Sequence, residues 1–426
     1  MRITLDYDRR GLEVTLPDAN VRQVLNVKAS EGIPDLAAAL NAALSAPLRC
    51  PPLKELARGK RTACIVVSDI TRPVPNREIL PPILAHLDAA GISRENILLL
   101  IATGLHRSTT PAELLEMFGE RIVRQCRIED HDGRDLSMHR YLGSTPRGIP
   151  VWVDKRYLDA DLRIVTGLVE PHLMAGYSGG RKAICPGISA VETIRRWHGP
   201  ELLESERACV GSLEGNPVHE EALAAAALAG CDFAVNVVLD SRRRIAALYA
   251  GALNDVFDAA VAAFNRIGMV HIARPAPIIV TSSGGYPLDA TWYQAIKGLT
   301  GALPAIERGG TMIMAAGLRE GVGGDDFRGI VAATRSFDEF MRKLREPGYF
   351  VIDQWQYEEL AKVARHAQIM VCSDVSRHAD LARSLVAPVE SVEAAVQKAL
   401  LRHGKDAGII VIPQGPYVLP QLRSIT

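Results

Sequence analysis

Seven runs of apolar residues recur along the chain, and each stops abruptly at a small or polar residue. Hydrophobicity within each run is continuous rather than alternating, which is typical of strands buried on both faces of a parallel sheet under helices. The runs are TACIVVSD (62–69), NILLLIATG (96–104), LRIVTGLV (162–169), APIIVTSSGG (276–285), GGTMIMAAG (309–317), AQIMVCSD (367–374) and GIIVIPQG (408–415). They predict the strands of buried, mainly parallel sheets.

Segments with helical periodicity alternate with these runs, and this alternation predicts an α/β fold. The clearest are NREILPPILAHLDAAG (76–91), TPAELLEMFGE (110–120), ALNDVFDAAVAAFNRIG (252–268) and ESVEAAVQKALLRHG (390–404). One segment differs, because residues 232–251 have the pattern of an antiparallel hairpin that turns near Asp240. After the helix that ends near Ile267, Pro275 and Pro277 start a fresh strand, so we expect a domain boundary near residue 272.

Composition excludes several classes of function. The chain has 426 residues, its 49 basic and 49 acidic residues cancel, and aromatic residues are only 5%, so neither nucleic acid nor an anionic membrane is an expected partner. The seven cysteines are scattered without a CxxC pair, which argues against a disulfide framework and indicates a reducing compartment. The chain shows neither an apolar signal region nor a run long enough to span a bilayer, so we expect a soluble, cytoplasmic protein.

Candidate chemistry gathers where the strands end. SDITRPVP (68–75), ATGLHRST (102–109) and GLVEPHLMAGYSGGRK (167–182) follow three strands, and SSGGYPLDATWYQAIKG (282–298) follows the first strand after the boundary. Ligands in open α/β sheets sit at the carboxyl ends of strands, so these polar residues are site candidates as a group.

Each candidate has an ordinary structural interpretation beside the functional one. Asp69 and Arg72 could form a local ion pair, or Arg72 could bind a carboxylate with its planar fork. His106 and His172 could be structural, or could converge as an acid and a base that titrate near neutrality. His198 closes a predicted helix, where it could interact with the helix dipole or ligate a metal. The spacing of the three histidines contains no helical HxxxH pair, so a zinc hydrolase site is weakly supported.

The glycine-rich stretch GYSGGRKAICPG (176–187) is not a P-loop, because Lys182 follows Arg181 and precedes Ala183. Its amides and two cations could bind a phosphate, or Lys182 could be a covalent anchor such as a Schiff-base lysine. Taken alone, a tight turn with surface charges is the favoured interpretation.

Tyr293, Gln294 and Lys297 are spaced to share one helix face, which fits a polar wall facing an inter-domain crevice. Trp355 could belong to the core or to a lid over the cleft.

Taken together, SDITRP, ATGLHR, EPHLMAGYSGGRKAICPGI, WHG and GGYPLDATWYQAIKG resemble, in matching order, the lactate racemase family that uses a nickel-pincer nucleotide. The resemblance implies two α/β domains with the active site in the cleft between them. The first would be residues 1–272, the second 273–408, and a final segment, about 409–426, would return to the first domain.

The resemblance also implies a cofactor, the pyridinium-3-thioamide-5-thiocarboxylic acid mononucleotide of nickel, joined covalently to Lys182 with His198 as a metal ligand. Asp69 and the loop residues Tyr177, Ser178, Gly179 and Gly180 would contact the nucleotide. His106 and His172 would be the acid/base pair of a hydride shuttle that inverts the α-carbon. Arg72 and Lys297 would bind the substrate, supported by a further set: Tyr293, Gln294 and Trp355.

The implied substrate is a small 2-hydroxy acid, such as lactate, malate, an aryl-lactate or an aldonate. Separate cofactor-biosynthesis proteins would load the nucleotide. Two alternatives stay open: a pyridoxal-phosphate-type racemase that uses Lys182, and a nucleotide- or metal-binding module without turnover. The oligomeric state is not predicted.

Overall fold

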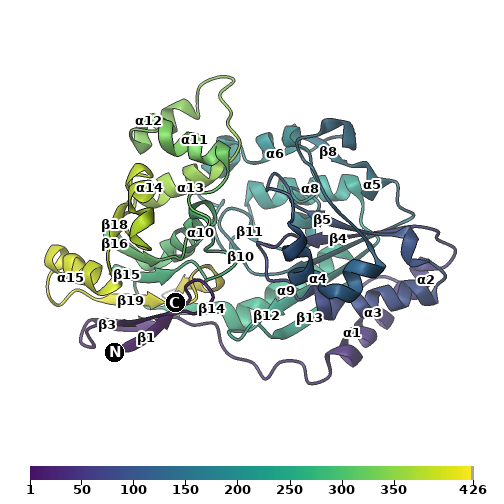
Figure 1. The fold of residues 1–426 in the computed structure, drawn as a ribbon, viewed down its shortest axis with the longest axis horizontal. Coiled ribbons are helices and arrows are strands. Elements are labelled where there is room, and N and C mark those ends of the chain that lie inside the picture. Colours follow the sequence, from purple (N-terminus) through teal and green to yellow (C-terminus); the bar gives the residue numbers. More distant parts are fainter. Residues whose placement is uncertain (424–426) are drawn as a thin grey trace.

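The computed structural model describes residues 1–423 and contains two six-stranded sheets with helices on their faces (Figure 1). The first sheet is built from β4 (Ala63–Ser68), β5 (Ile97–Ala102), β6 (Arg127–Asp130), β9 (Leu162–Leu168), β12 (Phe233–Leu239) and β13 (Ile245–Gly251). Their spatial order is β13-β12-β9-β4-β5-β6, and every neighbouring pair is parallel except β12 and β13. The predicted α/β class and the predicted hairpin are therefore confirmed.

Helices cover both faces of the first sheet because its strands are apolar on both sides. Side chains of the helices on one face join a core with those of β4, β5 and β9, and those on the other face join a second core. The first group is α1 (Leu36–Ser45), α2 (Leu53–Ala57), α3 (Asn76–Ala89) and α4 (Pro111–Gln125). The second group includes α5 (Lys155–Leu158), α6 (Val191–Trp197), α7 (Pro200–Leu203) and α8 (Pro217–Ala229). A long helix, α9 (Leu253–Gly268), packs on β12 and β13.

The second sheet is parallel throughout. Its strands are β3 (Val21–Val24), β15 (Ala276–Ser282), β16 (Ile306–Ala315), β17 (Ala367–Cys372), β18 (Ala387–Val389) and β19 (Ile409–Ile412). The order is β18-β17-β16-β15-β19-β3. One face packs against α10 (Trp292–Ala302), α11 (Asp325–Ala333), α12 (Phe337–Lys343) and α13 (Gln354–Ala364). The other packs against α15 (Val392–His403) and the hairpin β1 (Arg2–Leu5) and β2 (Leu12–Thr15), while α14 (His378–Arg383) lies beside β18.

The final segment divides between the halves and does not return wholly to the first domain, because β19 lies in the second sheet whereas Leu419, beyond it, packs with Val169 and Phe257 of the first half. All four residues of β19 are buried, and the strand completes the second sheet between β15 and β3. The N-terminal strands β1 to β3 also lie with the second sheet rather than the first. Beyond β19, β20 (Leu419–Leu422) pairs with β14 (Met269–Ile272), and residues 424–426 of the expected segment lie outside the described residues.

One small strand pair occupies the junction between the halves. The pair β10 (Pro171–His172) and β11 (Gly176–Tyr177) lies beside α10 in the centre of Figure 1. The remaining hairpin, β7 (His139–Ser144) and β8 (Pro150–Asp154), borders the first sheet. Within residues 1–423, no helix is both long and apolar enough to cross a membrane.

Candidate active site

A cavity of about 140 Å³ opens at the carboxyl ends of β4, β5 and β9, where α/β sheets commonly bind ligands. Residues of α10 and α13 line its opposite side, so the cavity lies between the two halves. Most residues that the sequence nominated line it: Asp69, Arg72, His106, His172, Ser178, Gly179, Lys182, His198, Tyr293, Lys297 and Trp355. The structure thus brings together polar residues that follow β4, β5 and β9 with residues of α10 and α13.

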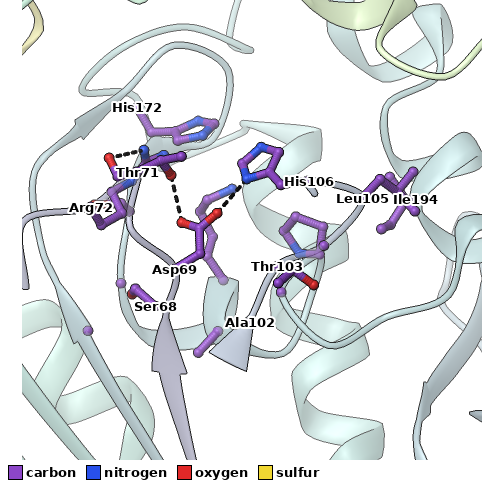
Figure 2. Close-up of a pocket in the computed structure, with 18 of the residues that line it drawn as sticks. Ser68, Asp69, Thr71, Arg72, Ala102, Thr103, Leu105, His106, His172 and Ile194 are labelled. Carbon is purple, nitrogen blue, oxygen red and sulfur yellow. Dashed lines mark hydrogen bonds and ion pairs between the residues drawn. The ribbon is translucent and has the colours of Figure 1, made fainter. Parts of the chain in front are cut away.

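The ring of His106 is held by Asp69 (Figure 2). Its Nδ1 lies 2.6 Å from Oδ2 of Asp69, while the Thr71 hydroxyl donates to the other carboxylate oxygen at 2.6 Å. Burial alone would raise the pKa of Asp69, but the His106 ring, together with Thr71, outweighs it and lowers the pKa. The carboxylate is therefore ionised and fixes the Nδ1 proton of His106. This leaves the Nε2 lone pair of His106 free to accept a proton.

His172 has the opposite arrangement. Its Nδ1 accepts from the backbone N–H groups of Met174 at 3.4 Å and Ala175 at 3.2 Å, so this nitrogen carries no proton. Burial first, and then neighbouring basic groups led by Lys182, hold the pKa of His172 well below its ordinary value. The neutral ring must consequently carry its single proton on Nε2. Figure 2 shows both imidazoles extending into the same cavity.

Lys182 lies on the 3-10 turn Gly180–Ala183, and the surface it still exposes faces the cavity. Burial, and then the charges of Arg181 and Arg72, lower the pKa of the Lys182 amine well below its ordinary range. Nζ lies 4.8 Å from the ring centroid of Trp197. A buried amine with a lowered pKa loses its proton more readily, and once uncharged it can form a covalent bond to a carbonyl or thiocarbonyl group.

His198 follows the last residue of α6 and is clamped between two indoles. Its ring stacks on Trp355 at 4.3 Å and 20°, and the ring of Trp197 lies at 4.5 Å. Its Nδ1 is buried without a hydrogen-bond partner, and burial, followed by the Lys182 charge, holds the pKa of His198 well below the ordinary value. A neutral, buried imidazole with an unpartnered nitrogen has the donor properties of a metal ligand.

The glycine-rich loop divides between the cavity and the core. Ser178 and Gly179 line the cavity, and Gly179 has φ +77° with so little space that a Cβ would lie 2.7 Å from Val169. Tyr177 and Gly180, also nominated as nucleotide contacts, do not line it. The Tyr177 hydroxyl donates to Asn265 of α9 at 2.6 Å, and the Gly180 N–H donates to a side chain of β12 at 2.9 Å. Only the middle of this stretch, Ser178 and Gly179, therefore reaches the cavity, and the residues on either side of it contact the core.

Polar residues of α10 complete the site. Lys297 donates to Oε1 of Gln294, whose Nε2 lies 3.4 Å from Nε2 of His106. Burial, and then Arg72, lower the pKa of Lys297 well below its ordinary value. The Tyr293 hydroxyl accepts a hydrogen bond from the Trp355 indole at 3.0 Å. This bond connects α10 to the stacked rings of Trp355 and His198. Trp355 therefore serves both as core and as a wall of the cavity.

Sequence reasoning missed Glu170. Its Oε1 lies 3.2 Å from Nε of Arg72, and the pair is almost fully buried. Arg72 is paired through Nε and donates from Nη1 to the carbonyl of Thr71 at 3.4 Å, so Nη2 is the guanidinium nitrogen left for a ligand in the cavity. Position was the only available signal, since Glu170 lies two residues before His172 in the same strand-end segment.

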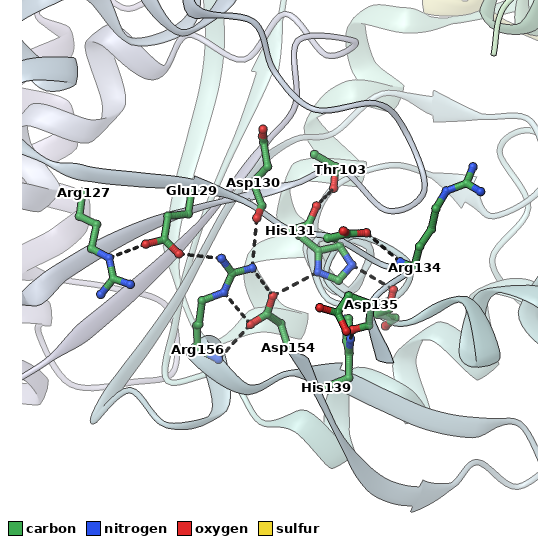
Figure 3. A network of polar contacts seen from close by, with 12 residues as sticks. Thr103, Arg127, Glu129, Asp130, His131, Arg134, Asp135, His139, Asp154 and Arg156 are labelled. Atoms are coloured by element: carbon green, nitrogen blue, oxygen red, sulfur yellow. Dashed lines mark hydrogen bonds and ion pairs between the residues drawn. The ribbon is translucent and has the colours of Figure 1, made fainter. Parts of the chain in front are cut away.

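A buried cluster of His131, His139 and Asp154 has ligand types that can hold a metal (Figure 3). Its Asp154 carboxylate, however, already accepts three bonds from Arg156, at 2.6 to 3.0 Å, and contacts Nδ1 of His131 at 3.2 Å. The positive charge of Arg156 beside the cluster disfavours the binding of a metal cation there. Nε2 of His131 lies 3.1 Å from the carbonyl of Ser189, so both ring nitrogens are occupied.

This cluster instead connects two of the segments that border the cavity. The backbone N–H of His131 donates to the carbonyl of Ile101, and its carbonyl accepts from the Thr103 hydroxyl at 2.5 Å. The ring contacts Ser189, just before α6. His131 thereby fastens the segment that carries His106 to the one that leads to His198.

Comparison with known proteins gives a consistent result. The family model for the lactate racemase N-terminal domain matches residues 7–211, and that for the lactate racemase C-terminal domain matches residues 272–419. A lactate racemase of Thermoanaerobacterium thermosaccharolyticum is 34% identical over 421 residues, 98% of each chain. One of Lactiplantibacillus plantarum is 34% identical over 424 residues, covering 97% of this chain and 98% of the relative.

Solved structures agree. The lactate racemase apoprotein from T. thermosaccharolyticum superposes with a TM-score of 0.91 at 33% identity, over 99% of this chain and 100% of the other. A protein from Thermotoga maritima, at 17% identity and a TM-score of 0.73, covers 93% of this chain and shares the fold.

Proposed function

The chain belongs to the lactate racemase family, and we propose that it inverts the α-carbon of a 2-hydroxy acid with the aid of a nickel-pincer nucleotide. The observation that carries the proposal is the opposite proton arrangement of His106 and His172 in one cavity. A racemase needs one group that accepts the hydroxyl proton and another that returns it on the other face. The two imidazoles are prepared for these roles before substrate arrives.

The residues present fit the nucleotide. The amine of Lys182, whose pKa is lowered by burial, is suited to the covalent bond, and the unpartnered Nδ1 of His198 is suited to the nickel ion. Ser178 and the amide of Gly179 lie where a ribose phosphate could be held. When bound, the nucleotide supplies the acceptor that takes the α-hydrogen as hydride and gives it back. We expect cofactor-biosynthesis proteins to deliver it and the protein to work in the cytoplasm.

The chain's own residues handle the protons and the carboxylate. Arg72, held by Glu170, and Lys297 bind the substrate carboxylate and orient the α-carbon. Nε2 of His106 accepts the hydroxyl proton, and Asp69 stabilises the imidazolium that results. When the planar 2-oxo acid is reduced on its other face, Nε2 of His172 passes its proton to the oxygen and becomes an imidazolate, which the nearby cations of Arg72 and Lys297 stabilise until solvent returns the proton. The reverse reaction exchanges the two roles.

Intact-protein mass spectrometry and metal analysis test the cofactor assignment. We expect a covalent adduct, removed by Lys182→Ala, with near-stoichiometric nickel that is reduced in His198→Ala. An aldehyde-lysine absorbance without nickel would instead support the pyridoxal-phosphate alternative. Retention of nucleotide and nickel with no inversion of any 2-hydroxy acid would support the binding-module alternative.

A further inference from the structure

A second cavity, of about 600 Å³, adjoins the first at His106. Five residues line both: Asp69, Thr71, Leu105, His106 and Tyr293. The second cavity is about four times the volume of the first, and it lies between the halves, with the loop after β5 on one side and α10 and α11 on the other. No part of the proposed proton chemistry uses this space.

A substrate bound by its carboxylate in the first cavity would extend toward the second cavity. Arg72, His172 and Lys297 line the first cavity only, whereas Gln294, which contacts His106, lines the second. A carboxylate bound by Arg72 and Lys297 therefore lies away from the second cavity. With the α-carbon between the two histidines, the remaining substituent of the α-carbon points past His106 toward the second cavity.

Most of the side chains that line the second cavity carry a charged, hydroxyl or amide group. Its only aliphatic lining residues among those described are Ile70, Leu105, Pro287 and Ala290. A pocket built for an apolar group is lined predominantly by apolar side chains. A methyl or longer alkyl chain would here displace water from charged and hydroxyl-bearing groups without replacing their hydrogen bonds.

The charges of the wall also disfavour a second carboxylate on the substrate. Three arginines line it, and each has an acidic partner in the same wall: Arg107 with Glu113 at 2.7 Å, Arg134 with Asp326 at 2.7 Å, and Arg328 with Asp325. Three further carboxylates, of Asp69, Glu320 and Asp353, make the wall net negative.

Asp353 has no salt-bridge partner among the described residues, and burial raises its pKa to about 6. It is mostly ionised at neutral pH and can accept hydrogen bonds from hydroxyl groups.

We propose that the second cavity is the subsite for a neutral, hydroxylated substituent, so that the preferred substrates are polyhydroxylated 2-hydroxy acids rather than lactate. The inference rests on the proposed function, because it needs the substrate carboxylate at Arg72 and Lys297. A site that hydrogen-bonds a hydroxyl group discriminates strongly against the analogue that lacks it.

An isosteric pair of acids tests the proposal with the nickel-loaded enzyme. Glycerate and 2-hydroxybutanoate differ only in a terminal hydroxyl in place of a methyl group. We expect kcat/KM to be at least tenfold higher for glycerate, and higher again for 2,3,4-trihydroxybutanoate, while malate is a poor substrate. Equal or faster inversion of 2-hydroxybutanoate, lactate or malate would overturn the subsite and leave the racemase function standing. Inversion of none of these acids by protein with adduct and nickel would overturn both.

Binding gives a readout that does not depend on turnover. The analogues 2,3-dihydroxy-2-methylpropanoate and 2-hydroxy-2-methylbutanoate lack an α-hydrogen, so calorimetry can compare their affinities directly. We expect the hydroxylated analogue to bind more tightly and Asp353→Asn, which removes the carboxylate acceptor, to reduce that preference. Asp338→Asn, at an exposed position outside the cavity lining, is the matched control. An undiminished preference in Asp353→Asn, with a control identical to wild type, would place the recognition elsewhere.

Discussion

His106 and His172 face one cavity with opposite hydrogen-bonding roles at Nδ1: this atom of His106 lies 2.6 Å from the Asp69 carboxylate, whereas that of His172 accepts from two backbone N–H groups. One ring consequently offers a lone pair at Nε2 and the other offers a proton. Burial keeps the His172 ring neutral by lowering its pKa. Under the proposed mechanism, inversion of one enantiomer would therefore begin without a preceding proton exchange with solvent.

Asp69→Asn should disrupt the proton arrangement at His106 while leaving the fold intact. An amide can no longer hold the His106 proton as an ionised carboxylate does, and it cannot stabilise the imidazolium. We expect kcat to fall about 10²-fold or more, with little change in cofactor content. The matched control is Asp88→Asn, an exposed residue paired with Arg94, which should leave kcat unchanged. Equal kcat in Asp69→Asn and wild type would remove Asp69 from the mechanism.

The stability of the unloaded protein should depend on pH through His172. Its pKa is lower in the folded than in the unfolded state, so the unfolded state binds more protons below about pH 6.5. Stability is then full above that pH and falls as the pH drops from 6.5 toward the folded-state pKa. Urea unfolding at several pH values measures the slope of the unfolding free energy against pH. In this window we expect that slope to be smaller for His172→Gln than for wild type by about 1.4 kcal/mol per pH unit. An unchanged slope would mean that His172 is protonated in the folded protein.

Replacing the buried amine should stabilise the unloaded protein. Burial lowers the pKa of Lys182, so the charged amine is less favourable in the folded protein than in the unfolded chain. Lys182→Met removes this cost and should raise the Tm by at least about 2 °C, while abolishing covalent cofactor retention. Lys54→Met, at an exposed position, should change neither quantity. A lower Tm for Lys182→Met would indicate that the amine is charged and paired.

The His131 cluster should hold the catalytic loop without binding metal. Asp154→Asn leaves Arg156 and His131 without their carboxylate and should cost about 3–5 kcal/mol of stability. Hydrogen exchange in residues 103–110 should accelerate more than in α15, which is remote from the cluster. Zinc titration of the unloaded wild-type protein should show no site that this substitution removes. Detection of such a site would restore the metal interpretation.

The sequence predicted the sheets because their strands are buried on both faces and therefore continuously apolar. It also grouped His106, His172 and Lys182 correctly in one cavity, since strand ends of parallel sheets meet at one edge. It could not predict that β19 joins the second sheet, because an apolar run does not specify its partner strand. Nor could it show that Tyr177 packs against α9, or that Glu170 holds Arg72, because both depend on side-chain direction in an irregular loop.

The most direct test of the account follows optical rotation while nickel-loaded enzyme acts on each pure enantiomer of glycerate, and then of lactate. We expect either enantiomer of an accepted acid to reach the same 1:1 mixture, and the single variants His106→Gln and His172→Gln to retain adduct and nickel while losing inversion of both enantiomers. Persistence of the starting enantiomers with adduct and nickel present in the wild type, or unimpaired inversion in either variant, would contradict the two-histidine mechanism.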